Sequence, residues 1–370
     1  MAKKNKTIDY WLLLITTILI VLGIAFLASA SSYSSNRDFG DPFYLIKHQL
    51  ISLGIGIVAF FVCLKINLKF FKKWLFYIFL INLLLMVLVF IPGIGASSGS
   101  STRWLSIGGI SVQPSEFLKL SFILYLAAWL SNQKKDKGAV FKKSKNATLL
   151  VFLCIISLIT GILILQSDLS TSLLIIAIGG LMYFASKYPL YHTVINVICI
   201  GLGGWVFSKI SPYRMSRILV FLNPGDDPLG AGYQIEQAKI AVGSGGITGV
   251  GLGMSQQRFG LLPQPISDSI FAILAEETGF IGATILVILF LLFAWRGFKI
   301  IKESSNIFFQ LIGVGIVSWI FIQSLLNIGA IIGLIPLTGI PLPFISYGGS
   351  ALIAELAGVG ILLNISKNKK

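Results

Sequence analysis

The chain has 370 residues, of which 55% are hydrophobic and only 12% are charged. Its mean hydropathy is +0.88. Charged residues make up about a quarter of a typical soluble domain, so this composition excludes a water-soluble globular protein. The formal net charge of +15 would suggest nucleic-acid binding in a soluble protein, but the distribution of the charges along the chain argues against that function.

Long, unbroken apolar runs recur along the chain and predict an all-α integral membrane protein. Lipid cannot hydrogen-bond to the backbone, so a segment that crosses it must be a helix or part of a closed barrel. Barrel strands alternate apolar and polar residues, whereas these runs do not. We therefore expect a single transmembrane domain over residues 1–370, a polytopic bundle of about ten transmembrane helices. The spans are expected near 10–31, 45–65, 73–93, 115–132, 147–166, 170–186, 192–209, 269–295, 307–335 and 350–365.

Basic and acidic residues are concentrated in opposite sets of connecting segments. The first apolar run follows Lys3, Lys4 and Lys6, as in a signal peptide, but it is long enough to span a bilayer and we interpret it as permanent. If residues 1–9 are cytoplasmic, the segments on that side carry twenty of the twenty-nine Lys and Arg residues. This positive-inside pattern predicts that both termini are cytoplasmic. Ten of the fourteen acidic residues fall toward the outer side, where we expect any chemistry to take place.

Two outer segments are longer than a turn requires, and loops of that length are more often functional than accidental. Residues 94–114 are rich in Gly and Ser. Residues 210–268, between the seventh and eighth spans, include a stretch at 235–242 that could form a short interfacial helix. No internal repeat is evident, which disfavours a transporter built from inverted repeats.

A first polar cluster surrounds the predicted start of the fourth span. Pro114 suits the first position of a helix, Ser115 could cap it, and Glu116 falls in the first turn. Glu116 and Lys119 are three residues apart and can pair on one helix face. Such a pair can be purely structural, but together with Arg103 it could also bind a phosphate or pyrophosphate group.

A second polar cluster begins where the long outer loop enters the eighth span. Asp268 would be partly desolvated at the edge of the membrane, which suits a general base, but its position before an apolar run also fits a helix N-cap. Glu276 and Glu277 follow and would lie just over two helical turns deeper. Charged groups at that depth are expected either to serve the function or to clamp neighbouring helices together, and the sequence leaves both open.

Two glycine-containing segments lack a complete catalytic or nucleotide-binding motif. Residues 243–253 resemble a phosphate-binding loop, but they lack the strand–loop–helix setting and the Lys-Ser/Thr ending of a nucleotide site. Residues 346–350 follow three prolines and are typical of a re-entrant or hinge segment. The three cysteines and two histidines lack metal-ligand spacing. From these residues alone, transporter and enzyme remain equally open.

The order of these motifs resembles that of the SEDS proteins (shape, elongation, division and sporulation), a family that includes FtsW, RodA and SpoVE. The resemblance covers almost the full length of the chain. The amino-acid sequence around residues 222–224 and 250–254 is more similar to the FtsW/SpoVE branch than to RodA. The motifs that carry it are Ser29–Ser32, Arg103-Trp104-Leu105, Gln113-Pro-Ser-Glu116, Asn223-Pro224, Asp227-Pro-Leu-Gly230, Gly232-Tyr-Gln234, Ala241-Val-Gly243, Gly251-Leu-Gly253, Asp268, Phe271-Ala-Ile273 and the stretch from Asn327 through Gly339 to Pro343–Gly349.

The resemblance implies a peptidoglycan glycosyltransferase that polymerises lipid II, the undecaprenyl-pyrophosphate-linked disaccharide peptide, in cell division. The reaction would take place at the outer face of the bacterial cytoplasmic membrane. The implied partners are a cognate class B penicillin-binding protein transpeptidase, divisome or elongasome proteins and membrane lipids, with no nucleic acid. The essential aspartate of the family falls on Asp268, here in Ser-Asp-Ser where Thr-Asp-Phe is usual. That departure, and Ser167-Asp168 where Pro-Asp is common, indicate a divergent member.

The resemblance also assigns roles to residues. Asp268 would deprotonate the acceptor 4-hydroxyl, and a single displacement would convert the α-linked donor into a β-linked product. Arg103, Lys119 or a bound divalent cation (Mg or Mn) would neutralise the departing pyrophosphate. Glu116 would orient Lys119. The other residues expected at the substrate are Trp104, Gln234, Glu276, Glu277 and Ser346.

Two alternatives remain open at this stage. A lipid II flippase would need a polar path across both leaflets, whereas the acidic residues collect at the outer end and only Glu355 could extend such a path inward. A noncatalytic scaffold that recruits a transpeptidase would not require Asp268.

Overall fold

The computed structural model describes residues 7–98, 101–107, 110–133, 145–189, 191–192, 194, 219–223, 227 and 230–367. Within these residues nine of the ten predicted spans are present as helices that differ from the expected bounds by a few residues at most ends. The seventh predicted span, 192–209, lies almost entirely outside the described residues. The helices are α1 Tyr10–Phe39, α2 Tyr44–Lys65, α3 Leu68–Phe71, α4 Leu75–Leu88, α5 Pro114–Gln133, α6 Lys145–Leu165, α7 Leu169–Ala185, α10 Ala231–Ser244, α11 Ile270–Glu303, α12 Ile307–Ile331 and α13 Gly349–Ser366, with a 3₁₀ turn η2 at Gln257–Phe259.

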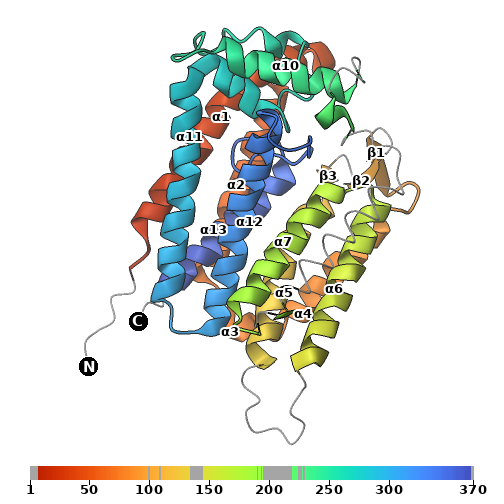
Figure 1. Ribbon diagram of the computed structural model, residues 1–370, viewed down its shortest axis with the longest axis vertical. Helices are drawn as coiled ribbons and strands as arrows, with labels where there is room; N and C mark the ends of the chain where they lie inside the picture. The colour runs from red at the N-terminus through yellow and green to blue at the C-terminus, as the bar shows by residue number, and fades with distance from the viewer. Residues whose placement is uncertain are drawn as a thin grey trace, which may run out of the picture.

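The helices form a polytopic membrane bundle, as predicted. Six of the described helices are long and apolar enough to cross a bilayer, and α4 and α7 are shorter apolar helices. Figure 1 shows the long helices running alongside one another, with α10 lying across one end. We call that end the cavity end, and the opposite end, where α1 begins and α13 ends, the basal end. The prediction of a short helix near 235–242 is confirmed by α10.

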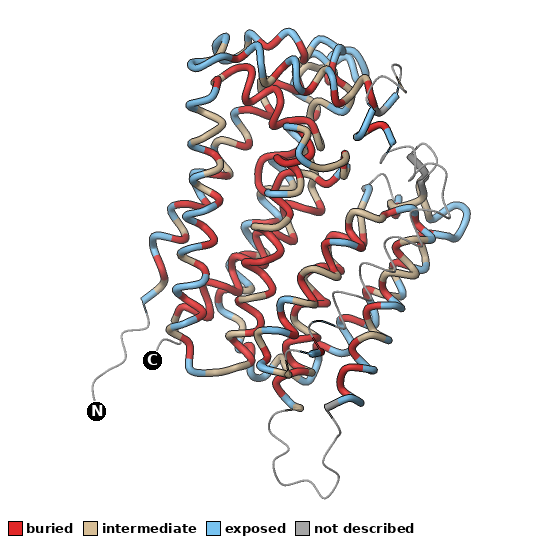
Figure 2. The backbone as a smooth tube through the Cα atoms, viewed as in Figure 1, coloured by how far each residue is buried: buried red, intermediate tan, exposed pale blue. Residues whose placement is uncertain are grey.

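The buried centre of the bundle is built from α12 and α13, while α2, α4 and α11 expose much of their apolar surface (Figure 2). This distribution is typical of a membrane protein, in which lipid covers the outer helix faces. The most extensive packing between two described helices joins α13 to α2, where a Cβ on Gly360 would lie 2.5 Å from the carbonyl oxygen of Phe60. Small residues at such crossings let membrane helices approach closely.

The segment between α4 and α5, which we expected to be a loop, contains a small sheet. Its strands β1 Gly95–Ser98, β2 Ser101–Ile107 and β3 Ile110–Val112 pair antiparallel in that order. Ala96 pairs with Trp104 and Ser97 with Thr102, so Arg103 is the extra residue of a β-bulge. Bulges redirect a side chain and are frequent next to active sites.

The eighth span is interrupted, contrary to the expectation of one continuous helix. Gly279 has φ 66° and ψ −166°, so α11 consists of a short helix from Ile270 and a longer one that ends at Glu303. The glycine-containing segment after α10 provides hydrogen-bond partners at the break. Gly251 N–H donates to the Glu277 carbonyl over 3.1 Å, and Phe280 N–H donates to the Gly246 carbonyl over 2.9 Å. Glu276 and Glu277 therefore lie at a helix break and not deeper within a continuous span.

We expect Gly249→Ala to lower the melting temperature of the purified protein markedly. Gly249 has φ +84°, and a Cβ there would lie 2.2 Å from the Glu277 carbonyl oxygen, so the alanine meets both backbone strain and a clash. Gly243→Ala is the matched control, because Gly243 lies in α10 and a Cβ added there would have nothing within 4 Å. Equal melting temperatures for the two variants in a thermal unfolding assay would show that the close approach at the break is unimportant.

Candidate active site

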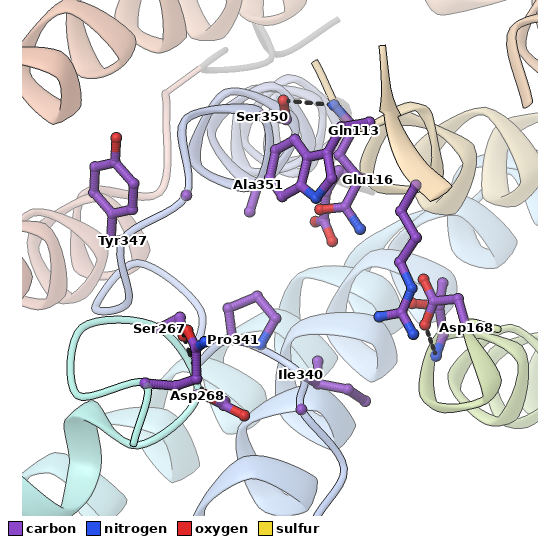
Figure 3. A pocket seen from close by; sticks show the side chains of 16 residues that line it. Gln113, Glu116, Asp168, Ser267, Asp268, Ile340, Pro341, Tyr347, Ser350 and Ala351 are labelled. Atoms are coloured by element: carbon purple, nitrogen blue, oxygen red, sulfur yellow. Dashed lines mark hydrogen bonds between the residues drawn. The ribbon is translucent and has the colours of Figure 1, made fainter. Parts of the chain in front are cut away.

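A polar cavity of about 340 Å³ opens at the cavity end of the bundle. In Figure 3, Asp268 lies across the open centre from Glu116, and Asp168 lies on a third side. Its wall combines residues from β2, the start of α5, the start of α7, the turn before α11, the segment between α12 and α13, and the start of α13. The lining residues are Arg103, Trp104, Gln113, Glu116, Asp168, Thr171, Gln264, Ser267, Asp268, Gly339, Ile340, Pro341, Tyr347, Gly348, Ser350 and Ala351.

Asp268 lies in the turn that leads into α11 and is half-buried. The helix begins at Ile270 with Ser269 at the N-cap position, so Asp268 precedes the cap by one residue and does not occupy it. Its Oδ1 accepts a hydrogen bond of 3.0 Å from the Ser267 hydroxyl, which can hold the carboxylate in one orientation. The side chain is thus directed by its neighbour while remaining part of the cavity wall.

Two buried side chains fix the backbone around Asp268 to the segment between α12 and α13. Asn327 Nδ2 donates to the Asp268 carbonyl over 2.7 Å and to the Ile340 carbonyl over 2.8 Å. The Ser346 hydroxyl donates to the Ser267 carbonyl and accepts from Leu342 N–H over 2.7 Å. These hydrogen bonds join two walls of the cavity that are far apart in sequence.

Arg103 and Trp104 both line the cavity although they are neighbours on β2. Side chains normally alternate between the two faces of a strand, and the bulge at Arg103 breaks that alternation. The Arg103 guanidinium donates from Nε to the Gln166 carbonyl over 3.3 Å and from Nη2 to the Ser167 carbonyl. It is thereby anchored to the turn that precedes Asp168.

Glu116 and Lys119 form the predicted pair, but the pair is buried in the bundle. Lys119 Nζ lies 2.6 Å from Glu116 Oε2, with side-chain exposures of 1% and 4%. Nζ also donates to Gln323 Oε1 over 3.0 Å and lies 5.3 Å from the centroid of the Trp319 ring. Ser115, expected as a cap, lies inside α5 instead, because the helix begins at Pro114.

The cavity carries more negative than positive groups. Among its described lining residues, Glu116, Asp168 and Asp268 are acidic and Arg103 is the only base. Burial, with a smaller contribution from Tyr44, raises the pKa of Tyr347, so its phenol stays protonated and can donate a hydrogen bond. Within the described parts of the chain no three metal-ligating side chains converge. The described residues therefore offer no three-ligand site for a resident divalent cation, and we derive no step through one.

The structure brings only some of the predicted site residues to one cavity. Asp268, Arg103, Trp104 and Glu116 line it, whereas Lys119 lies behind Glu116. Gln234 contacts the Ser269 hydroxyl over 3.1 Å, one residue from Asp268. Ser346 supports the turn from outside the wall.

Glu276 and Glu277 do not line the cavity and instead hold segments at the cavity end together. Glu276 accepts from the Ser255 hydroxyl and from Gln256 N–H over 3.2 Å, while Glu277 accepts from the Ser29 hydroxyl of α1. These contacts agree with the second alternative that the sequence left open for the two glutamates, a clamp between neighbouring helices. Neither glutamate, expected at the substrate, is among the residues that line this cavity.

Several cavity residues were not predicted as site residues. Asp168 caps α7 through a 3.2 Å hydrogen bond from Thr171 N–H and faces the cavity, which a capping pattern alone cannot indicate. Gln113, Tyr347 and Ser350 lie within or beside the family motifs given above. Their position in or next to these motifs could have identified them as candidate site residues. Gln113 N–H donates to the Ser350 hydroxyl over 3.1 Å and joins α5 to α13.

We expect Asn327→Ala to lower the rate of glycan polymerisation, the reaction that the resemblance implies, at least tenfold per folded molecule, because Asp268 loses the support of its carbonyl group. Asn364→Ala is the matched control: Asn364 Nδ2 likewise donates to two carbonyls, those of Cys63 at 2.9 Å and Ile66 at 2.7 Å, at the basal end. Turnover normalised to folded protein separates the two variants. The same loss in both would assign Asn327 a purely structural role.

Comparison with known proteins decides the family. The model of the FtsW/RodA/SpoVE cell cycle proteins matches residues 10–370. The chain belongs to this family. Stage V sporulation protein E of Bacillus subtilis is 41% identical over 368 residues, covering 99% of each chain. The "Probable peptidoglycan glycosyltransferase FtsW" of Coxiella burnetii is 36% identical and covers 98% of each chain. The predicted family and its FtsW/SpoVE branch are thus confirmed.

Solved structures, among them one of RodA, share the fold. A chain from a peptidoglycan synthase complex that coordinates polymerization and crosslinking superposes with a TM-score of 0.77 at 25% identity, covering 97% of this chain and 98% of that one. RodA of Thermus thermophilus superposes with a TM-score of 0.71 at 23% identity and covers 98% of each chain. The described helices therefore represent the family fold.

Proposed function

We propose that this chain is an inverting peptidoglycan glycosyltransferase that polymerises lipid II in the Asp268 cavity. The observation that carries the proposal is the convergence of Asp268, Arg103 and Glu116 on one cavity. The chain is also similar in sequence, over almost its whole length, to a protein named as a probable peptidoglycan glycosyltransferase. With a volume of about 340 Å³, the cavity suits the reacting centre of two sugars, while the lipid tails and stem peptides lie outside it.

The reaction needs one base and one displacement. The Asp268 carboxylate takes the proton of the acceptor 4-hydroxyl as its oxygen attacks the anomeric carbon of the donor. The new bond forms on the face opposite the bond to the pyrophosphate oxygen, which breaks at the same time and turns an α linkage into a β linkage. The Ser267 hydroxyl, 3.0 Å from Asp268 Oδ1, keeps the base oriented before the acceptor arrives.

The leaving group is an undecaprenyl pyrophosphate that gains negative charge as the bond breaks. Arg103 is the basic group at the cavity wall, and its anchoring to the turn before Asp168 presents the guanidinium in a fixed position. We place the pyrophosphate at Arg103, because this is the only basic side chain among the described residues that line the cavity. Lys119 acts indirectly in this scheme, by holding Glu116.

The proposed setting is the outer face of the bacterial cytoplasmic membrane, with both termini in the cytoplasm. The distribution of basic residues supports this orientation, in which the cavity end faces outward. A class B penicillin-binding protein transpeptidase is the proposed partner, supported by the similarity to a chain of a complex that coordinates polymerization and crosslinking. Cell division is the proposed process.

Two rival functions predict different results in one experiment. Purified protein is incubated with lipid II in detergent, and in parallel reconstituted into vesicles that carry lipid II in both leaflets, with and without the transpeptidase. The enzyme yields glycan polymer in detergent, where no leaflet has to be crossed. Transbilayer movement without polymer would favour a flippase, and recruitment of the transpeptidase with neither activity would favour a scaffold.

A further inference from the structure

A second cavity of about 160 Å³ lies at the basal end, separate from the Asp268 cavity. Its wall is made by apolar side chains of α2, α3, α4, α5, α12 and α13, and it shares no residue with the polar cavity. The short helix α3 contributes Leu68 and Phe71, α4 contributes Ile78, and α12 contributes Phe308. A wholly apolar cavity at the surface of a membrane bundle suits a hydrocarbon chain.

The chain segment that lines this cavity also carries a dense group of cations. Residues 65–73 contain four lysines, and no Asp or Glu occurs between residues 42 and 115. Lys69 and Lys73 are exposed, and the half-buried Lys72 has its Nζ 4.8 Å from the centroid of the Phe308 ring, which lines the cavity. Positive charge and apolar space are therefore adjacent, and the segment itself contains no acidic residue.

Aromatic side chains mark the level of the membrane interface at the same place. Phe70 and Trp74 are 59% and 49% exposed. Lys73 Nζ lies 4.8 Å from the Phe70 ring centroid and 5.6 Å from that of Trp74. Exposed Trp beside Lys is typical of the boundary between hydrocarbon and headgroups, where a lysine directs its ammonium group toward the phosphates.

We propose that this corner of the bundle binds one anionic phospholipid from the adjacent leaflet. The phosphate lies against Lys69 and Lys73, and an acyl chain enters the apolar cavity past Ile78. A free phosphate ion would not occupy the apolar cavity, and a neutral lipid would gain little electrostatic attraction from the lysines. The proposal is independent of the reaction at Asp268.

Native mass spectrometry of the purified protein, titrated with phosphatidylglycerol or with phosphatidylcholine of the same acyl chains, tests the headgroup contact. We expect phosphatidylglycerol to bind about tenfold more tightly or more. Lys69→Gln with Lys73→Gln should abolish that preference. Lys299→Gln with Lys302→Gln is the matched control, because these lysines are also exposed at the basal end and Lys299 lies 5.8 Å from the Trp295 ring.

Ile78→Trp tests the acyl-chain contact by blocking the cavity. Ile78 is 39% exposed, so the larger side chain can be accommodated without disturbing the core. We expect it to weaken the binding of both lipids severalfold, whereas Ile81→Trp, on the same helix but outside the cavity wall, should not. Equal binding of the two lipids, the same loss with the Lys299 and Lys302 pair, or an unchanged affinity in Ile78→Trp would each overturn the proposal.

Discussion

Asp268→Asn is expected to reduce glycan polymer formed from purified lipid II at least a hundredfold, with the protein still inserted and folded. Asparagine keeps the size of the side chain and can still accept the hydrogen bond from Ser267, but it cannot take a proton from the acceptor hydroxyl. General-base catalysis contributes roughly 10²–10⁴ in rate, which sets the expected size of the loss. Polymer resolved by length on a gel provides the measurement.

The matched control for this variant is Asp38→Asn, which removes another acidic group at the cavity end. Asp38 is exposed and paired with Arg37 over 2.7 Å, outside the cavity wall. Its polymer yield should equal that of the wild type. Normal polymerisation by Asp268→Asn would remove Asp268 from the mechanism while leaving the enzyme assignment intact.

Lys119→Met is expected to destabilise the protein by about 3–5 kcal/mol, because it leaves the Glu116 carboxylate buried without its cation. Gln323 also loses the Nζ donor at 3.0 Å. The double variant Glu116→Gln with Lys119→Met should recover most of the loss, since it removes both charges. Thermal unfolding in detergent measures the stability of each variant.

The exposed pair of Lys47 and Asp41, 2.7 Å apart, provides the control for Lys119. Lys47→Met should leave the melting temperature unchanged, because solvent screens an exposed pair. If the single and double variants at Glu116 and Lys119 unfold at the same temperature, the buried pair does not couple and the account of its role fails.

The membrane fold could be predicted closely because lipid restricts what a chain can do. Span ends follow from hydropathy and from lysines such as Lys65, and the helix start at Pro114 follows from the missing N–H of proline. The sheet at 95–112 could not be predicted, because its first strand is composed of Gly, Ala and Ser residues with weak strand preference. The break at Gly279 was also missed, because a glycine in an apolar run gives no sign of positive φ.

The site could be predicted in part because its motif residues lie on segments that meet. Asp268, Arg103 and Glu116 reach the same cavity. The direction of other side chains depends on tertiary packing that residue type does not reveal. Glu277 thus contacts Ser29 of α1, and Lys119 contacts Gln323 of α12. A β-bulge, which directs Arg103, has no reliable signal in a single sequence.

The central claim, that Asp268 acts in the chemical step, is tested most directly by measuring lipid II binding and single-turnover transfer on the same preparation of Asp268→Asn. If Asp268 acts only in transfer, the variant should bind lipid II with a dissociation constant within a few fold of that of the wild type, while its transfer rate should fall to a negligible value. Our account predicts this result. Loss of binding together with retained transfer at saturating lipid II would contradict it and make Asp268 a substrate-binding residue.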